Sequence, residues 1–292
     1  MVTGKNKNMV LVAGASGALG LEILKLLKQK DLPIRALVHS EEGASRAALF
    51  TSDIWKAGAE HGHEIEGITK GVSTIISALG KSISLFNHDE KSFMENDFEG
   101  NKNVLRDAAK HDVSRVIYVS IKGADTAREF EVAKAHGRFE EELRNSGFQH
   151  TIIRPVGFFS GLNDLAIIAK RKVIPIVGSG EAKTNSIHQK DLAEVVVGYL
   201  HDGPEVIDIG GPLIHTRLEM AEMVREKFGG KIVKIPEKLA DIGMVLPEMI
   251  SKNTSAKLDY FRYVTTNDMI GEKRGSITFK EYLNHLDLNQ LP

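Results

Sequence analysis

Hydrophobic positions near the start of the chain follow two patterns, one directly after the other. Residues 10–13 form a short continuous apolar run, which is typical of a strand buried on both faces of a parallel sheet. From Leu19 onward, apolar residues recur at helical spacing, at Ile23, Leu24 and Leu27, with charged residues between them. The pattern therefore predicts a buried strand followed at once by an amphipathic helix.

The alternation of strand and helix continues through the first half of the chain. Short apolar runs predict strands, and longer segments with helical spacing predict helices. The predicted strands are 34–38, 51–54, 72–80, 113–120 and 151–155, and the predicted helices are 91–111 and 131–145. Elements in this order predict an α/β fold with a doubly wound parallel sheet of the Rossmann type. On the second helix, His136, Glu140, Glu141 and Arg144 are expected on the solvent-facing side.

Beyond residue 155 the pattern is less regular. The predicted elements are a strand and turn at 173–180, a strand at 206–211, and a helix at 216–228 closed by Gly229-Gly230. Asp191 is expected to cap a helix that runs to Leu200. For the rest of the chain only mixed short elements are predicted.

Three glycines lie at the junction of the first strand and the first helix. Gly14, Gly17 and Gly20 form a GxxGxxG motif in the strand–turn–helix context that such a motif requires. Glycines allow a tight turn, a close approach of the backbone to a pyrophosphate, and close packing of helix on strand. The helix N-terminus then offers unpaired N–H groups and a partial positive charge to phosphates. The motif predicts a dinucleotide-binding site, and an ordinary glycine-rich turn is the alternative.

The end of the second strand bears on which dinucleotide is preferred. A site for NAD commonly places a carboxylate there to hold the ribose 2′-hydroxyl. Here the strand ends in His39 and Ser40, with Glu41 and Glu42 beyond it. This favours NADP(H) over NAD(H). Two alternatives stay open, because a glutamate can fold back toward the ribose and His39 can be an ordinary loop residue.

Composition removes several classes of function. In 292 residues, 42% are hydrophobic and 26% charged, as in a soluble globular protein, and the net charge is −1. A nearly neutral chain gives no reason to expect nucleic acid or a membrane as partner. Without cysteine, disulfides and thiolate chemistry are excluded. The apolar run after Lys7 is short and interrupted by glycines, so we expect no signal peptide, no transmembrane span and a cytoplasmic location.

One histidine pair has the spacing of a metal site. His61 and His63 are followed by Glu64, but no third and fourth ligand is recognisable in the sequence. We therefore expect exposed histidines on a loop and no bound metal.

Several short motifs occur together in an order that is specific for one superfamily. They are residues 12–20, 52–54, 76–80, 100–105, 118–120, 133–135, 153–159 and 187–193. With them the chain resembles the atypical short-chain dehydrogenase/reductase superfamily, in particular its NmrA-like, NAD(P)H-binding group. The resemblance covers most of the chain and implies no particular substrate.

The resemblance implies a set of cofactor-binding residues. They are Gly14, Ser16, Gly17, Ala18, Leu19 and Gly20 at the pyrophosphate; His39 and Ser40 near the adenosine ribose; Asp53 and Ile54 at the adenine; Ala78, Leu79 and Gly80 along the ribose path; Lys134 at a ribose; and Pro155, Val156 and Phe158 beside the nicotinamide. It also implies that residues 8–155 form the NAD(P)-binding domain, with 186–211 returning to it, and that 156–292 form a C-terminal α/β substrate-binding cap.

The expected catalytic centre departs from the best-known pattern of the superfamily, a serine followed by Tyr-x-x-x-Lys. Ser120 and Lys134 stand at the serine and lysine positions, but Phe130 stands where the tyrosine belongs. The tyrosine would exchange a proton with the substrate oxygen, and phenylalanine has none to give. Lys134 is one candidate substitute. The other candidates, each also open to a structural interpretation, are His136, His188, Tyr260 and Tyr263.

These features predict an NAD(P)H-dependent oxidoreductase that reduces a small carbonyl or conjugated compound, with Ser120 and Lys134 in catalysis. The alternative is an NAD(P)H-binding redox sensor or assembly factor without turnover, which the missing tyrosine favours. A nucleotide-sugar epimerase or dehydratase requires that tyrosine and ranks last. The expected partner is a small-molecule substrate, and the expected state is a monomer or homodimer.

Overall fold

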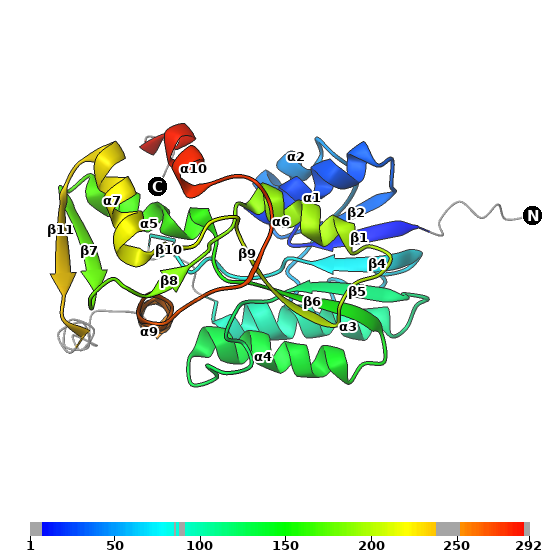
Figure 1. The fold of residues 1–292 in the computed structure, drawn as a ribbon. Helices are drawn as coiled ribbons and strands as arrows, with labels where there is room; N and C mark the ends of the chain where they lie inside the picture. Colours follow the sequence, from blue (N-terminus) through cyan, green and yellow to red (C-terminus); the bar gives the residue numbers. More distant parts are fainter. Residues whose placement is uncertain (1–7, 85, 88–90, 238–251, 289–292) are drawn as a thin grey trace, which may run out of the picture.

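An eight-stranded sheet runs through the centre of the molecule, and its neighbouring strands pair in parallel (Figure 1). The computed structural model describes residues 8–84, 86–87, 91–237 and 252–288. Across the sheet the strands are β12 (Glu272–Lys273), β9 (Val206–Gly210), β6 (Gln149–Pro155), β5 (Arg115–Val119), β4 (Val72–Ser77), β1 (Met9–Ala13), β2 (Ile34–Val38) and β3 (Asp53–Lys56). The order reverses between β1 and β4, as in a doubly wound sheet, so the predicted fold class is confirmed.

Helices cover both faces of this sheet. On one face lie α1 (Ala18–Gln29), α2 (Glu41–Ala47) and α6 (Gln189–Gly198), and on the other lie α3 (Gly100–Ala108) and α4 (Glu131–Arg144) (Figure 1). All five residues of β1 are buried, with Leu11 and Ala13 facing α3 and α4 while Val10 and Val12 face α1 and α6. The continuous apolar run at 10–13 is thus buried on both faces, as predicted. The chain reaches α3 through a π-helical segment, Met94–Glu99.

A second, smaller core forms beyond β6. Strands β7 (Val173–Val177) and β11 (Lys231–Ile235) pair in parallel, beside α5 (Asn163–Ala169), α7 (Arg217–Phe228) and α10 (Phe279–His285). The short strands β8 (Lys183–Thr184) and β10 (His215–Thr216) pair between this core and the main sheet (Figure 1). Helix α7 confirms the helix predicted at 216–228, because Thr216 forms a capping box with Glu219 and Gly229 ends the helix at φ +77°.

Three predicted elements differ from the structure. Strand β3 begins at Asp53, whereas the prediction ended it at Ile54. Helix α6 is capped by His188, whose Nδ1 accepts from the Lys190 N–H, and not by Asp191. Asp191 is buried in the first turn of α6, where its carboxylate accepts from the N–H groups of residues 276 and 277. The C-terminal region holds a 15-residue helix, α9 (Lys252–Thr266), in place of only short elements.

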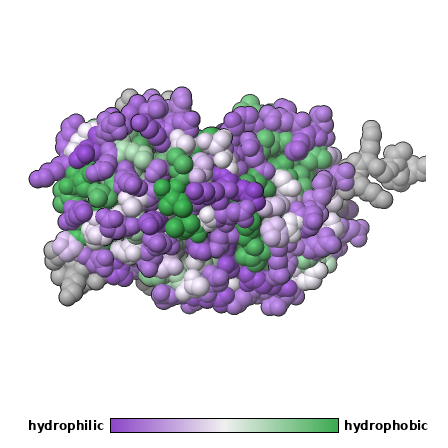
Figure 2. Space-filling model, viewed as in Figure 1, coloured by the Kyte–Doolittle hydropathy of each residue, from purple (hydrophilic) through white to green (hydrophobic). Residues whose placement is uncertain are grey.

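The surface seen in Figure 2 is mainly hydrophilic, with apolar side chains gathered in a few separate patches. Four of the exposed large hydrophobic residues, Val173, Leu213, Ile214 and Val233, belong to the small sheet or to the loop before β10. Within the described ranges, every helix is either too short or too polar to span a membrane.

Candidate functional site

The glycine turn between β1 and α1 has a shape that only glycine permits at two positions. Gly14 has φ +78°, and a Cβ on it would lie 2.5 Å from the carbonyl oxygen of Ala78 at the end of β4. A Cβ on Gly20 would lie 2.2 Å from the carbonyl oxygen of Gly14. The three-glycine spacing therefore reflects close approach of backbone to backbone at the point where the strand order reverses.

The N-terminus of α1 is open to an anion. Its N-cap, Gly17, has no side chain to accept from the first N–H groups, and the first turn carries no acidic residue. Gly17 and Ala18 are exposed, so these donors and the positive end of the helix dipole face outward beside the glycine turn. Gly14, Ser16, Gly17, Ala18 and Leu19, the residues predicted to hold a pyrophosphate, are brought together here.

The end of β2 carries the residues predicted to lie near the adenosine ribose. His39 is exposed, and the Ser40 hydroxyl accepts from the Gly43 N–H at 3.1 Å as the cap of α2. The carboxylate of Glu41 forms an ion pair with Lys56 at the end of β3. Glu42 lies 3.9 Å from Arg46 on its own helix. Both carboxylates near the ribose position thus already have a cationic partner.

Asp53 is not brought to this edge. It pairs in register with Arg35, three residues before β3 ends, and the Arg35 Nε lies 3.1 Å from its carboxylate oxygens. Arg35 also donates to the carbonyls of Ile68 and Lys70, which precede β4. The carboxylate is therefore held toward the amino-terminal half of the strands. Lys56, in register with Val38, marks the carboxyl end of β3.

The end of β4 is held by α3 and the π-helical segment before it. Asn101 donates to the carbonyls of Leu79 and Asp97, and its side-chain oxygen accepts from Ser77. The Asp97 carboxylate accepts from the Lys81 N–H at 2.9 Å. These contacts position Ala78, Leu79 and Gly80 at the carboxyl edge. Asn101 and Asp97 were not singled out from the sequence, although Asn101 lies in the motif at 100–105.

Ser120, at the end of β5, is part of a buried ionic network. Its hydroxyl donates to Glu140 of α4 at 2.7 Å, and Glu140 also accepts from Arg154 at 2.8 Å and Arg144 at 3.1 Å. Arg154 in turn donates to Asp125 at 2.7 Å. Glu140 is fully buried, and the hydrogen bond to it is the main cause that raises the pKa of Arg154 above its ordinary value. The prediction that Glu140 faces solvent is wrong, because this residue balances a buried guanidinium.

His136 lies in a second buried chain of polar groups. Its Nδ1 is 2.6 Å from the Tyr118 hydroxyl, and its Nε2 is 3.4 Å from the Asp97 carboxylate. All three residues are buried, and burial, with the charges of Asp97 and Glu140, raises the pKa of Tyr118. The prediction that His136 faces solvent is therefore wrong, because both ring nitrogens have buried partners.

Phe130 and Lys134 lie at the start of α4. Phe130 is the N-cap residue, and its ring centre is 5.0 Å from that of Tyr263 in α9. Lys134 is exposed, and its ammonium has no hydrogen-bond or ion-pair partner among the described residues. The ammonium is thus free to meet a ligand.

The end of β6 carries the residues predicted beside the nicotinamide. Val156 donates to the Ile209 carbonyl at 3.0 Å, and Phe158 forms a β-bridge with Ile187. Pro155 and Val156 are buried, whereas Phe158 is partly exposed. With β1, β4 and β5, these residues complete a contiguous edge at the carboxyl ends of the strands.

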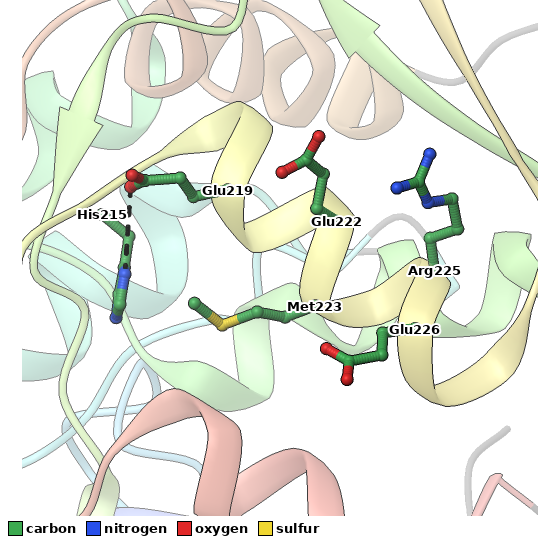
Figure 3. A pocket seen from close by; sticks show the side chains of 6 residues that line it. All are labelled: His215, Glu219, Glu222, Met223, Arg225 and Glu226. Atoms are coloured by element: carbon green, nitrogen blue, oxygen red, sulfur yellow. Dashed lines mark ion pairs between the residues drawn. The ribbon is translucent and has the colours of Figure 1, made fainter.

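An open hollow of about 520 Å³ lies elsewhere, over α7 (Figure 3). It is lined by His215, Glu219, Glu222, Met223, Arg225 and Glu226. His215 lies 4.0 Å from Glu219, and burial lowers its pKa. Glu219 is already engaged in the capping box of α7. The hollow shares no residue with the carboxyl edge, so the candidate site remains the edge described above.

Comparison with known proteins agrees with this geometry. A family model described as NAD(P)H-binding matches residues 14–203, and the chain therefore belongs to this family. The chain is 27% identical over 240 residues to the mitochondrial NADH-ubiquinone oxidoreductase 40 kDa subunit of Neurospora crassa, covering 78% of this chain and 63% of the relative. It is 23% identical to an NAD(P)H azoreductase of Xenophilus azovorans, covering 83% and 84%.

A similar fold occurs in a solved structure. The NADPH complex of the quinone oxidoreductase QOR2 from Escherichia coli aligns with TM-score 0.72 and 19% identity, covering 95% of this chain and 99% of that one. The first curated relatives are longer, and the chain spans 60–63% of their length. The resemblance to NAD(P)H-binding atypical short-chain dehydrogenases/reductases is thus confirmed.

Proposed function

We propose that the chain is an NAD(P)H-dependent reductase of a small carbonyl or conjugated compound. The observation that carries the proposal is the open N-terminus of α1 beside the glycine turn, at the point where the strand order reverses. A bound reduced nicotinamide supplies a hydride, and the protein supplies orientation and a site for the acceptor.

The residues at the carboxyl edge divide the binding task. Gly14, Gly17 and the N–H groups of α1 hold the pyrophosphate, while Leu79 and Gly80 follow the ribose. Phe158 lies beside the nicotinamide, and Lys134 binds its ribose through the free ammonium. Ser120 contributes indirectly, since its only proton is donated to Glu140.

The charges near the end of β2 favour NADPH over NADH. Glu41 and Glu42 are each paired with a cation, while His39 is exposed and the exposed Lys56 ammonium can exchange its Glu41 partner for a 2′-phosphate. We expect Lys56→Ala to weaken NADPH binding about fivefold, since an exposed charge contact contributes about 1 kcal/mol. NADH binding should not weaken, because the substitution also frees Glu41 for a 2′-hydroxyl. Fluorescence titration with both cofactors checks this. Lys70→Ala removes the same charge before β4, at the opposite edge, and is the control; equal losses in both variants would contradict a local role for Lys56.

Lys134 provides the direct test of turnover. We expect Lys134→Ala to lower the rate of NADPH oxidation at least tenfold, because the nicotinamide ribose loses its cationic partner. The measurement is NADPH consumption with naphthoquinone, cinnamaldehyde and cyclohexenone as acceptors. Lys170→Ala, on the C-cap of α5, is the control. Absence of both NADPH and NADH binding to the wild-type protein would refute the proposal altogether.

A second candidate function is NAD(P)H binding without turnover, as in a redox sensor or assembly factor. Phe130 has no proton to give, and the Ser120 hydroxyl is committed to Glu140, which favours this candidate. Tight NADPH binding with no consumption of cofactor across the three acceptors would establish it over the reductase.

A further inference from the structure

Helix α9 lies across the carboxyl edge of the sheet. Asn253 donates to the Lys91 carbonyl at 3.0 Å, and Lys257 donates to the Ser84 carbonyl at 2.9 Å. Further along the same helix, the Tyr260 hydroxyl donates to the Lys122 carbonyl at 3.1 Å, and Tyr263 packs on Phe130. Residues spaced by three and four share one face of a helix. One face of α9 therefore touches the loops after β4 and β5 and the start of α4.

We propose that Tyr263 is the general acid of the reductase, a phenol supplied by α9 at the place where α4 carries Phe130. The inference rests on the proposed function, because a hydride alone does not complete the reduction of a carbonyl or an enone. The hydride adds to the electrophilic carbon of the acceptor. The π electrons move onto the carbonyl oxygen, or onto the α-carbon of an enone, and the Tyr263 hydroxyl gives its proton to that atom. Water then returns a proton to the phenolate.

Lys134 is assigned to the nicotinamide ribose, and two other candidate acids at this edge already have side-chain partners. His136 lies between Tyr118 and Asp97, and Ser120 donates to Glu140. Two further candidates are less suited by their surroundings. The His188 ring lies beside Phe159 and Tyr282 of the smaller core. Tyr260 is buried and donates to a carbonyl, and burial raises its pKa well above its ordinary value.

Tyr263 differs from these groups. Among the described residues its hydroxyl has no hydrogen-bond partner, and the side chain is partly exposed. The hydroxyl borders the loop after β5, since a Cβ on Gly123 would lie 3.3 Å from it. Lys134 lies one helical turn beyond Phe130, on the same side of α4, and its ammonium favours the phenolate left after proton transfer.

The test is Tyr263→Phe, assayed with NADPH and cinnamaldehyde. We expect kcat to fall about 100-fold, the magnitude of general acid catalysis, while the Kd for NADPH stays within twofold. The fold should persist, because the ring still packs on Phe130 and the lost hydroxyl makes no bond within the described chain. Tyr199→Phe, beyond the amino-terminal edge of the sheet, is the matched control and should retain wild-type kcat.

A second variant separates catalysis from packing. In F130Y/Y263F a phenol returns on the neighbouring ring, and we expect kcat to recover at least tenfold over Y263F. A Y263F protein with kcat within threefold of wild type overturns the inference but not the proposed reductase function. A loss of kcat in Y263F that the added F130Y substitution does not relieve has the same consequence. A wild-type protein that binds NADPH but reduces none of the acceptors overturns both proposals.

Discussion

Gly20→Ala is expected to weaken NADPH binding at least 100-fold and to lower the melting temperature by several degrees. The added Cβ would lie 2.2 Å from the carbonyl oxygen of Gly14 and 2.8 Å from the Cα of Ala15. Both neighbours are backbone, so no side chain can rotate away, and α1 must move off the glycine turn. A shift of this kind displaces the N–H groups that hold the pyrophosphate, and we expect at least a 100-fold rise in the Kd for NADPH.

Two other glycines provide controls for this result. Gly198, in α6, has nothing within 4 Å of its Cβ position, so Gly198→Ala should leave NADPH binding unchanged and should not lower stability. At Gly17 the nearest atom lies 3.4 Å away, an ordinary contact, so Gly17→Ala should retain the melting temperature of the unliganded protein. Thermal melts with and without NADPH measure both effects. If Gly20→Ala bound NADPH with wild-type affinity, the close-packing role of Gly20 would be wrong.

The sequence predicts this region well because its determinants are local. The buried run at 10–13, the glycine spacing and the helical period from Leu19 lie within 20 residues of one another. Each reflects a short-range rule, the pleat of a strand or the turn of a helix. The same rules predicted β5, β6 and α4, which the structure confirms.

The buried polar groups behind the site follow no local rule. The charge of Glu140 and its place beside Glu141 predict that it lies on the solvent side of α4. Its partners, Ser120 and Arg154, come from two strands, 20 and 14 residues away in the sequence. A single sequence contains no signal for such pairing, since a glutamate that balances a buried arginine looks the same as one in water.

Register and tertiary contact explain the other differences. Whether Asp53 reaches the carboxyl edge depends on how far β3 extends. Arg35, at the matching position of β2, holds the Asp53 carboxylate toward the amino-terminal half of the strands. The face of α9 that carries Tyr260 and Tyr263 packs on the main core and also donates to backbone carbonyls of distant loops. Its tyrosines were predicted as candidates, but only the three-dimensional contacts distinguish Tyr263 from Tyr260.

Removal of the Glu140 carboxylate is expected to cost about 3–5 kcal/mol of unfolding free energy, because it leaves a buried guanidinium without its main partner. Glu140 is fully buried and accepts from Ser120, Arg144 and Arg154, the last of which is itself only 6% exposed. In Glu140→Ala the bond from Arg154 to Asp125 remains, but Asp125 is exposed and only partly replaces the loss. Urea denaturation at neutral pH measures the difference.

The neighbouring glutamate is the matched control. Glu141, on the surface of the same helix, forms an ion pair with Arg128, which precedes that helix, and Glu141→Ala should cost at most about 1 kcal/mol. A double-mutant cycle then isolates the buried pair. Since E140A/R154A leaves no uncompensated buried guanidinium, it should be less destabilising than the sum of its single variants by about 2 kcal/mol. Equal losses of unfolding free energy in E140A and E141A would mean that Glu140 does not stabilise the buried Arg154 guanidinium beneath the site.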